Sequence, residues 1–139
     1  MIEFIVDGQP QRKRRPRFRR VGNYVQTYTP KETHDYEKHI VDCYLEQVGQ
    51  VMLEDVPIKV NITAYFQVPK AFSKRKRQEA ITHIIKPHNR LDVDNIAKVV
   101  LDALNGVAYS DDHYITDLTI RKRYAEQPRL EVRIGEVKE

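Results

Sequence analysis

Disulfides, tryptophan and long apolar runs are all missing from this 139-residue sequence. No stretch approaches the roughly 20 apolar residues that a membrane-spanning helix requires, so no membrane segment is predicted. The single cysteine, Cys43, cannot form an internal disulfide and stands in no recognisable metal-binding motif. We therefore expect Cys43 to pack as a small buried hydrophobe. The opening residues MIEFIVDGQPQ lack the apolar core and cleavage site of a signal peptide, which predicts a cytoplasmic protein.

The chain has the length and composition of one folded domain, spanning residues 1–139. Apolar residues make up 40% and charged residues 32%, a balance typical of globular rather than disordered proteins.

The charge distribution is uneven, although the net charge is only +4. Basic residues gather in a first segment that contains Arg12, Lys13, Arg14, Arg15, Arg17, Arg19 and Arg20. Shorter clusters stand at 74–77 and 121–123, and aspartates concentrate between 92 and 112. Basic segments around a compact acidic focus are what a metal-dependent enzyme acting on polyphosphate needs, because the bound cation cancels the carboxylates' repulsion of phosphate.

The hydrophobic pattern predicts a mixed α/β (α+β) fold, in which helices pack on a small mixed sheet in a single compact domain. The clearest strand follows Pro57, where apolar and polar residues alternate from Ile58 to Phe66 except at Tyr65. Ser73 is the expected N-cap of a short basic helix. The remaining expected elements are a strand at 1–7, an extended loop or hairpin to about 28, helices at about 30–51, 73–84 and 95–104, and strands near 113–124 and 129–134.

The acidic focus combines carboxylates with a lysine. Asp92 and Asp94 stand two apart where we expect an extended segment to lead into a helix, so both side chains should face one site. Lys98 follows Asp94 by four residues and should share its helix face. Asp111 and Asp112 come after the turn that ends this helix.

Carboxylates that converge in this way suit Mg²⁺ or Mn²⁺, both of which prefer oxygen ligands. Such a centre supports phosphodiester hydrolysis, and a nearby lysine would stabilise the transition state or protonate the leaving group. Each fragment alone also has a structural interpretation: an N-cap with a solvated acid, a surface ion pair and a turn. An EF-hand is excluded because Ala97 and Lys98 replace its glycine and its next oxygen ligand.

Several segments together resemble the RusA family of Holliday-junction resolvases. The central run is DVDNIAK at 92–98, LDALNG at 101–106 and the doublet Asp111-Asp112. The opening Gly8-x-Pro10, followed by the basic Arg15-Pro16-Arg17, also resembles the start of that family. The segment 86–88 (KPH) resembles the version common in phage and Gram-positive-type members.

The resemblance implies a homodimer that binds four-way DNA junctions and nicks two strands symmetrically with Mg²⁺ or Mn²⁺. It assigns metal-site carboxylates to Asp92, Asp94 and Asp112, and the catalytic lysine to Lys98. Supporting roles are expected for Asn95, Asp111 and Lys86. We expect Asp102, one turn after Lys98, to pair with that lysine.

The basic segment is the predicted DNA surface. Its arginines alternate with Phe18, Tyr24 and Tyr28, and aromatic rings stack on unpaired bases. A nuclear-import-like basic run or a solubilising loop are alternative interpretations of this segment. The basic helix contributes Lys74, Arg75 and Lys76, although a solvated helix face is about as good an interpretation there. His88, beside the acidic focus, is either a contact for DNA or a metal or, as the simpler interpretation, a plain loop histidine. The other four histidines show no ligand spacing: His34, His39, His83 and His113.

Two other functions remain open from the sequence. One is a non-catalytic binding protein for branched or single-stranded DNA, which leaves the aspartates without a purpose. The other is a metal-dependent nuclease of different structural specificity.

Overall fold

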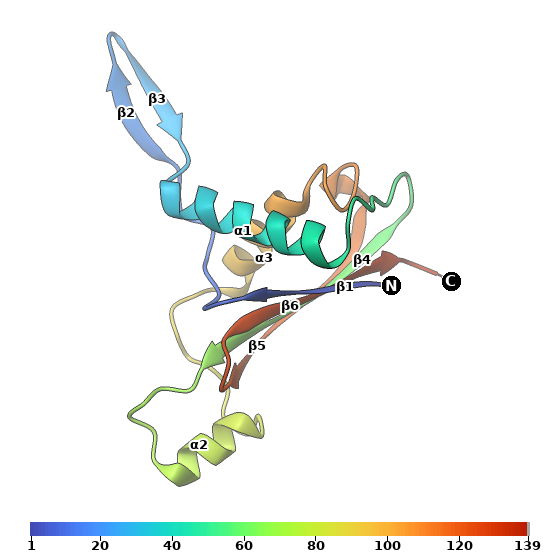
Figure 1. The fold of residues 1–139 in the computed structure, drawn as a ribbon. Helices are drawn as coiled ribbons and strands as arrows, with labels where there is room; N and C mark the ends of the chain where they lie inside the picture. The colour runs from blue at the N-terminus through green and yellow to red at the C-terminus, as the bar shows by residue number, and fades with distance from the viewer. Residues whose placement is uncertain (139) are drawn as a thin grey trace.

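The computed structural model describes residues 1–138 and shows a mixed sheet with helices on one face and a projecting hairpin (Figure 1). Within these residues the strands are β1 (Ile2–Asp7), β2 (Arg17–Val21), β3 (Tyr24–Tyr28), β4 (Ile58–Gln67), β5 (Ile115–Ala125) and β6 (Arg129–Glu136). The helices are α1 (Lys31–Gln47), α2 (Lys74–Ile81), α3 (Val93–Leu104) and the single 3₁₀ turn η1 (Asp112–Tyr114).

The main sheet has the strand order β1-β6-β4-β5. β4 and β5 run parallel, because the chain between them crosses over through α2 and α3, whereas β6 pairs antiparallel with both β1 and β4. The predicted mixed sheet is confirmed.

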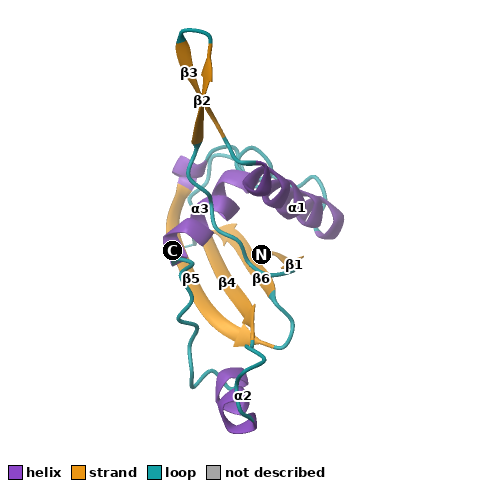
Figure 2. Ribbon diagram, turned by 90° about the vertical axis from the view of Figure 1, so that its left-hand side faces the viewer, coloured by secondary structure: helices purple, strands orange, loops and turns teal. Residues whose placement is uncertain are grey.

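One face of this sheet forms the core. Along β4 the side chains of Ile58, Val60, Ile62, Ala64 and Phe66 are buried, and the residues between them are only partly covered. Helices α1 and α3 pack over this face, and α3 turns its buried apolar stripe toward the sheet (Figures 1 and 2).

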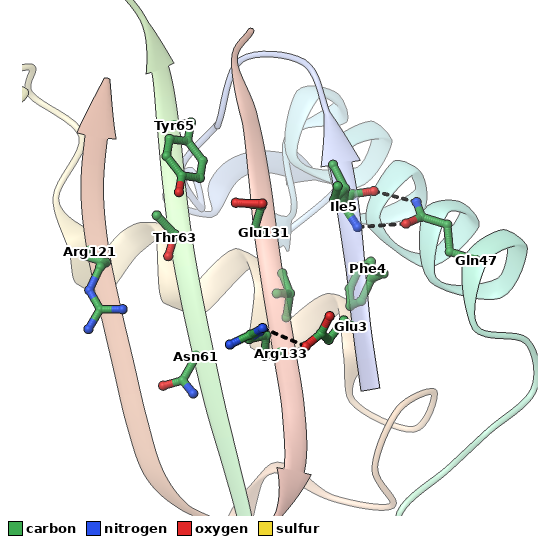
Figure 3. Close-up of a pocket in the computed structure, with 11 residues that line it drawn as sticks. Glu3, Phe4, Ile5, Gln47, Asn61, Thr63, Tyr65, Arg121, Glu131 and Arg133 are labelled. Carbon is green, nitrogen blue, oxygen red and sulfur yellow. Dashed lines mark hydrogen bonds and ion pairs between the residues drawn. The ribbon is translucent and has the colours of Figure 1, made fainter. Parts of the chain in front are cut away.

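The opposite face of the sheet is polar and open (Figure 3). Tyr65, the exception in the β4 pattern, points to this side, together with an ion pair of 2.9 Å between Arg133 and Glu3. Gln47 of α1 covers the outer edge of β1 by bonding both backbone polar groups of Ile5, at 2.9 and 2.6 Å. These bonds satisfy part of an edge strand that would otherwise be free to pair with another chain. The shallow pocket on this face, about 620 Å³, is lined by none of the predicted site residues that the structure describes.

Strands β2 and β3 form a hairpin that projects from the body, so the loop-or-hairpin segment is a hairpin (Figures 1 and 2). α2 lies at the opposite end of the molecule in both views. Phe18, Tyr24 and Val25 are 70%, 64% and 65% exposed on the hairpin, which makes it an apolar and basic arm rather than part of the core.

The predicted elements are all present, and their boundaries differ by a few residues. Helix α1 ends at Gln47 rather than near 51, with Gly49 just beyond it at φ 97°. Helix α3 begins at Val93 rather than Asn95, so Asp94 lies in the first helical turn and not in an extended segment. Ser73 accepts from the backbone of Lys76, which confirms it as the N-cap of α2. None of the described helices is long and apolar enough to cross a membrane.

Candidate nuclease site

The start of α3 presents the first two aspartates. Asp92 occupies the N-cap position, where its carbonyl accepts from the backbone N–H groups of Asn95 and Ile96 at 3.1 Å each. Within the described residues its carboxylate makes no capping hydrogen bond. Asp94 follows in the first turn, where a negative charge is stabilised by the helix dipole. Both carboxylates are therefore exposed and available to a ligand.

A groove of about 960 Å³ joins the aspartates to the basic segment. Asp92, Asp94, Asn95 and Lys98 form one wall, and residues 12–17 form the other. The structure thus brings together two features that stand about 80 positions apart in the sequence. A backbone bond of 3.1 Å from Lys13 to the carbonyl of Asn95 joins the two walls.

Lys13 anchors the basic segment through its side chain as well. Its ammonium lies 3.1 Å from Glu37 of α1 and 3.3 Å from Asp102 of α3, and its side chain is only 22% exposed. Burial lowers the pKa of Lys13, but hydrogen bonds and charges from the two carboxylates outweigh this and leave the pKa above its ordinary value. In a further hydrogen bond of 3.1 Å, the backbone N–H of Arg14 donates to the hydroxyl oxygen of buried Thr33 and so also holds the basic segment to α1.

These ion pairs correct one sequence prediction. Asp102 pairs with Lys13, and among the described residues no ion pair joins it to Lys98. Lys98 is exposed and lines the groove together with the two aspartates. DNA contact by Lys13 stays a prediction, and it would compete with the pairs to Glu37 and Asp102.

The doublet after the helix has two distinct members. Asp111 caps η1 by accepting from the backbone of His113 at 3.2 Å, and it pairs with the His113 ring at 3.1 Å. The hydrogen bonds from His113 lower the pKa of Asp111, whereas a hydrogen bond with Asp111 raises the pKa of Asp112. Asp111 is thus engaged with its neighbour His113.

Asp112 lies toward the end of α3, because Tyr109, three residues before it, donates its hydroxyl to the carbonyl of Leu101 at 2.5 Å. The charge of Asp102 raises the pKa of Asp112 further, and Asp102 stands eight residues, or about 12 Å of helix, beyond Asp94. Asp92, by contrast, acts electrostatically on Lys122. Among the described residues, no group of three ligand atoms within 4.8 Å includes Asp92, Asp94 and Asp112. The single chain therefore places Asp92 and Asp94 at the start of α3 and Asp112 beyond its end, rather than all three around one point.

Lys122 of β5 is a residue that the sequence analysis did not single out. Its ammonium donates to the carbonyls of Asn89 and Leu91, at 3.1 and 2.8 Å, and so holds the turn that leads into Asp92. Burial lowers the pKa of Lys122 below its ordinary value, and the charge of Asp92 offsets only part of this effect. The basic run at 121–123 was visible in the sequence, but the loop that Lys122 holds is 31 residues away.

The predicted DNA residues outside the groove lie toward the two ends of the molecule. Arg19 and Arg20 belong to the hairpin, which Arg17 begins at the groove. Lys74, Arg75 and Lys76 are exposed on α2 at the opposite end. Lys86 donates to the carbonyl of His83 and so helps to close the turn after α2. His88 is exposed in the loop between α2 and α3.

Comparison with known proteins gives the family of this chain. The model of a family described as endodeoxyribonuclease RusA matches residues 7–135. This chain belongs to the RusA family. It is 32% identical to the uncharacterized protein YqaN of Bacillus subtilis (strain 168), over 98% of this chain and 96% of that one. It is 25% identical to the crossover junction endodeoxyribonuclease rusA of Lactococcus phage r1t, over 98% and 97% of the two chains.

Membership of the RusA family makes the chain a nuclease domain of the hydrolase class at family level. The match covers both walls of the groove, so the family relationship includes the predicted site as well as the sheet.

Proposed function

We propose that this RusA-family protein is a divalent-cation-dependent endonuclease that resolves four-way DNA junctions by paired, symmetric nicks during recombination and repair. The observation that carries the proposal is the groove in which Asp92, Asp94 and Lys98 face the basic residues 12–17. A binding protein would need only the basic wall.

The basic wall of the groove would bind the DNA backbone, and the acidic wall would bind the cation. Arginine side chains such as Arg12 and Arg17 grip phosphate oxygens with paired N–H groups and would seat the DNA backbone in the groove. The backbone then passes the exposed carboxylates, which on their own would repel it. A cation at Asp92 and Asp94 removes that repulsion.

The donor set fits Mg²⁺ or Mn²⁺. Asp92 and Asp94 offer exposed carboxylate oxygens, the ligands that both cations prefer, and leave room for water and phosphate oxygens. When bound, such a cation supplies a more acidic water and stabilises negative charge on the phosphate.

The protein groups around the scissile phosphate have separate proposed roles. Lys98, free of the ion pair to Asp102, places a positive charge where the phosphate gains negative charge. Asn95 lines the same wall and holds the basic segment through its carbonyl. We propose Asp112, toward the far end of α3, as a third carboxylate that contributes less to cation binding than Asp94, with Asp111 keeping η1 in place.

Selectivity for branched DNA is proposed to come from a homodimer. Two symmetry-related grooves would place two cuts symmetrically across a junction. The hairpin extends each DNA surface with Arg19, Arg20 and the exposed ring of Phe18, which would stack on an unpaired base.

The test is cleavage of a synthetic four-way junction, beside linear duplex and single-strand controls, in Mg²⁺, Mn²⁺ or EDTA. We expect paired nicks that require the cation and that occur at the junction only. Binding without nicks in any divalent cation would support the non-catalytic alternative. Cleavage of flaps or linear duplex at equal rates would support a nuclease of other specificity.

A further inference from the structure

A second group of metal-ligand side chains lies away from the acidic groove, between the end of β1 and the middle of α1. Asp7 is the last residue of β1, and the chain turns away at Gly8, whose φ is 97°. His39 and Cys43 stand one helical turn apart on α1 and face Asp7 together.

The three potential ligand atoms are close to one another. The Nε2 atom of His39 lies 3.0 Å from a carboxylate oxygen of Asp7. The Cys43 sulfur lies 3.8 Å from that oxygen and 3.8 Å from His39 Nε2. Among the described residues, this is the group of three whose ligand atoms all lie within 4.8 Å.

These separations match a tetrahedral zinc ion. Zn–N and Zn–O bonds of about 2.0 Å and a Zn–S bond of about 2.3 Å place tetrahedral ligands roughly 3.3 to 3.6 Å apart. The observed 3.0, 3.8 and 3.8 Å differ from these values by a few tenths of an ångström. The Cys43 sulfur also lies 3.9 Å from His39 Nδ1, which places it over the face of the imidazole ring, and His39 Nε2 lies 3.1 Å from the Asp7 carbonyl oxygen. Binding of a shared ion therefore requires the His39 ring to turn until a nitrogen lone pair points at the ion.

The environment suits a zinc ion that keeps one open position. The Cys43 side chain is 7% exposed, whereas Asp7 and His39 are 86% and 41% exposed, so the outer side of the group faces solvent. Burial and the charge of Asp7 raise the pKa of the Cys43 thiol, and a bound cation would displace its proton. A thiolate and a carboxylate would then neutralise the two charges of Zn²⁺.

We propose that Asp7, His39 and Cys43 form a zinc-binding site, with water as the fourth ligand, that fastens the end of β1 to α1. The site is separate from the proposed nuclease centre in both place and chemistry. A nitrogen–sulfur–oxygen donor set favours Zn²⁺, whereas the all-oxygen groove favours Mg²⁺ or Mn²⁺.

The test is a cobalt titration of the full chain after removal of metals with EDTA. We expect the thiolate-to-cobalt charge-transfer band and the strong visible bands of a tetrahedral site to saturate at one Co²⁺ per chain, and to be lost when one Zn²⁺ per chain is added. Cys43→Ser should abolish the charge-transfer band. His39→Ala and Asp7→Asn should each weaken zinc binding by at least about 100-fold, as measured by competition with a chromogenic chelator.

Matched controls separate this site from others on the same helix and in the groove. Asp42→Asn changes an exposed carboxylate beside Cys43 that pairs with Lys38 instead, and should leave the titration unchanged. Asp94→Asn should leave the charge-transfer band unchanged, which makes this readout independent of the nuclease. Asp7 is exposed, so Asp7→Asn keeps the test valid even if changes at Cys43 impair folding. A missing charge-transfer band, or zinc binding unaffected by Asp7→Asn and Cys43→Ser, would overturn the proposal.

Discussion

Replacing Lys13 by Met should lower the stability of the protein as well as its affinity for DNA. The change removes an ammonium that bridges Glu37 and Asp102, with distances of 3.1 and 3.3 Å. Glu37 is only 18% exposed and would lose its partner, while Asp102 is 39% exposed and would be solvated in part. A hydrogen bond to a charged group contributes about 1.5–3 kcal/mol when buried, and solvent screening reduces it here to about 1–2 kcal/mol.

This loss is large enough to measure by thermal unfolding. With an unfolding entropy of about 2.1 cal/mol/K per residue, a 139-residue chain should lose about 3–7 °C in Tm for such a change. The assay is circular dichroism or calorimetry at neutral pH. Lys31→Met is the matched control, because Lys31 also pairs with a carboxylate, at 3.0 Å, but is 87% exposed. We expect no resolvable change in Tm for that variant.

The pH dependence of the difference gives a second check. Because the pKa of Lys13 is raised in the folded protein, its stabilisation is complete below the ordinary value of 10.5 and is lost as the pH rises through the folded pKa. The Tm difference between wild type and Lys13→Met should therefore be constant near neutrality and narrow in strong alkali. Equal Tm values for Lys13→Met and Lys31→Met at neutral pH would refute the anchoring role.

Three further predictions concern the site. Asp94→Asn should reduce junction cleavage more than about 100-fold while junction binding in EDTA is retained. It should also weaken Mg²⁺ binding more than Asp112→Asn does, because Asp112 lies toward the far end of α3. Equal effects of the two changes in a calorimetric Mg²⁺ titration would mean that both acids hold one ion. Lys122→Met should lower the cleavage rate without lowering junction affinity, because the turn before Asp92 loses two anchoring hydrogen bonds. Arg121→Met, on the opposite face of β5, is the control and should change neither quantity. An unchanged cleavage rate in Lys122→Met would show that Lys122 does not position Asp92. Phe18→Ala should leave Tm unchanged, since the ring is 70% exposed, and should weaken junction binding by about 1–3 kcal/mol in a gel-shift assay; unaltered affinity would show that the ring does not stack.

Local patterns were enough to predict the elements that carry the site. The alternation along β4 and the helical stripe of α3 each depend on residues close together in the sequence, and both elements are present as expected. The RusA resemblance also rests on short runs, since Asp92, Asp94 and Lys98 share one helical start. Backbone periodicity alone places such residues on one side of an element.

The start of α3 shows where local prediction failed. The extended geometry expected at Asp94 was wrong, because the helix begins at Val93 and takes Asp94 into its first turn. Both aspartates still face one groove, since a residue at the N-cap and one in the first turn both lie at the exposed end of the helix. Helix ends are decided by capping and packing, which the periodic pattern does not encode.

Contacts between distant segments were decided only by the tertiary structure. The sequence determined that this chain has a basic segment, an acidic helix start and one cysteine. Packing of α1 and α3 on the sheet decided that Lys13 pairs with Glu37 and Asp102, and that Asp112 stands apart from Asp94. It also brought Asp7 of β1 to His39 and Cys43, whose four-residue spacing on α1 had not been recognised as a ligand spacing in the sequence. The physical reason is that a spacing rule holds only within one element, whereas the distance between two elements depends on how the whole core packs.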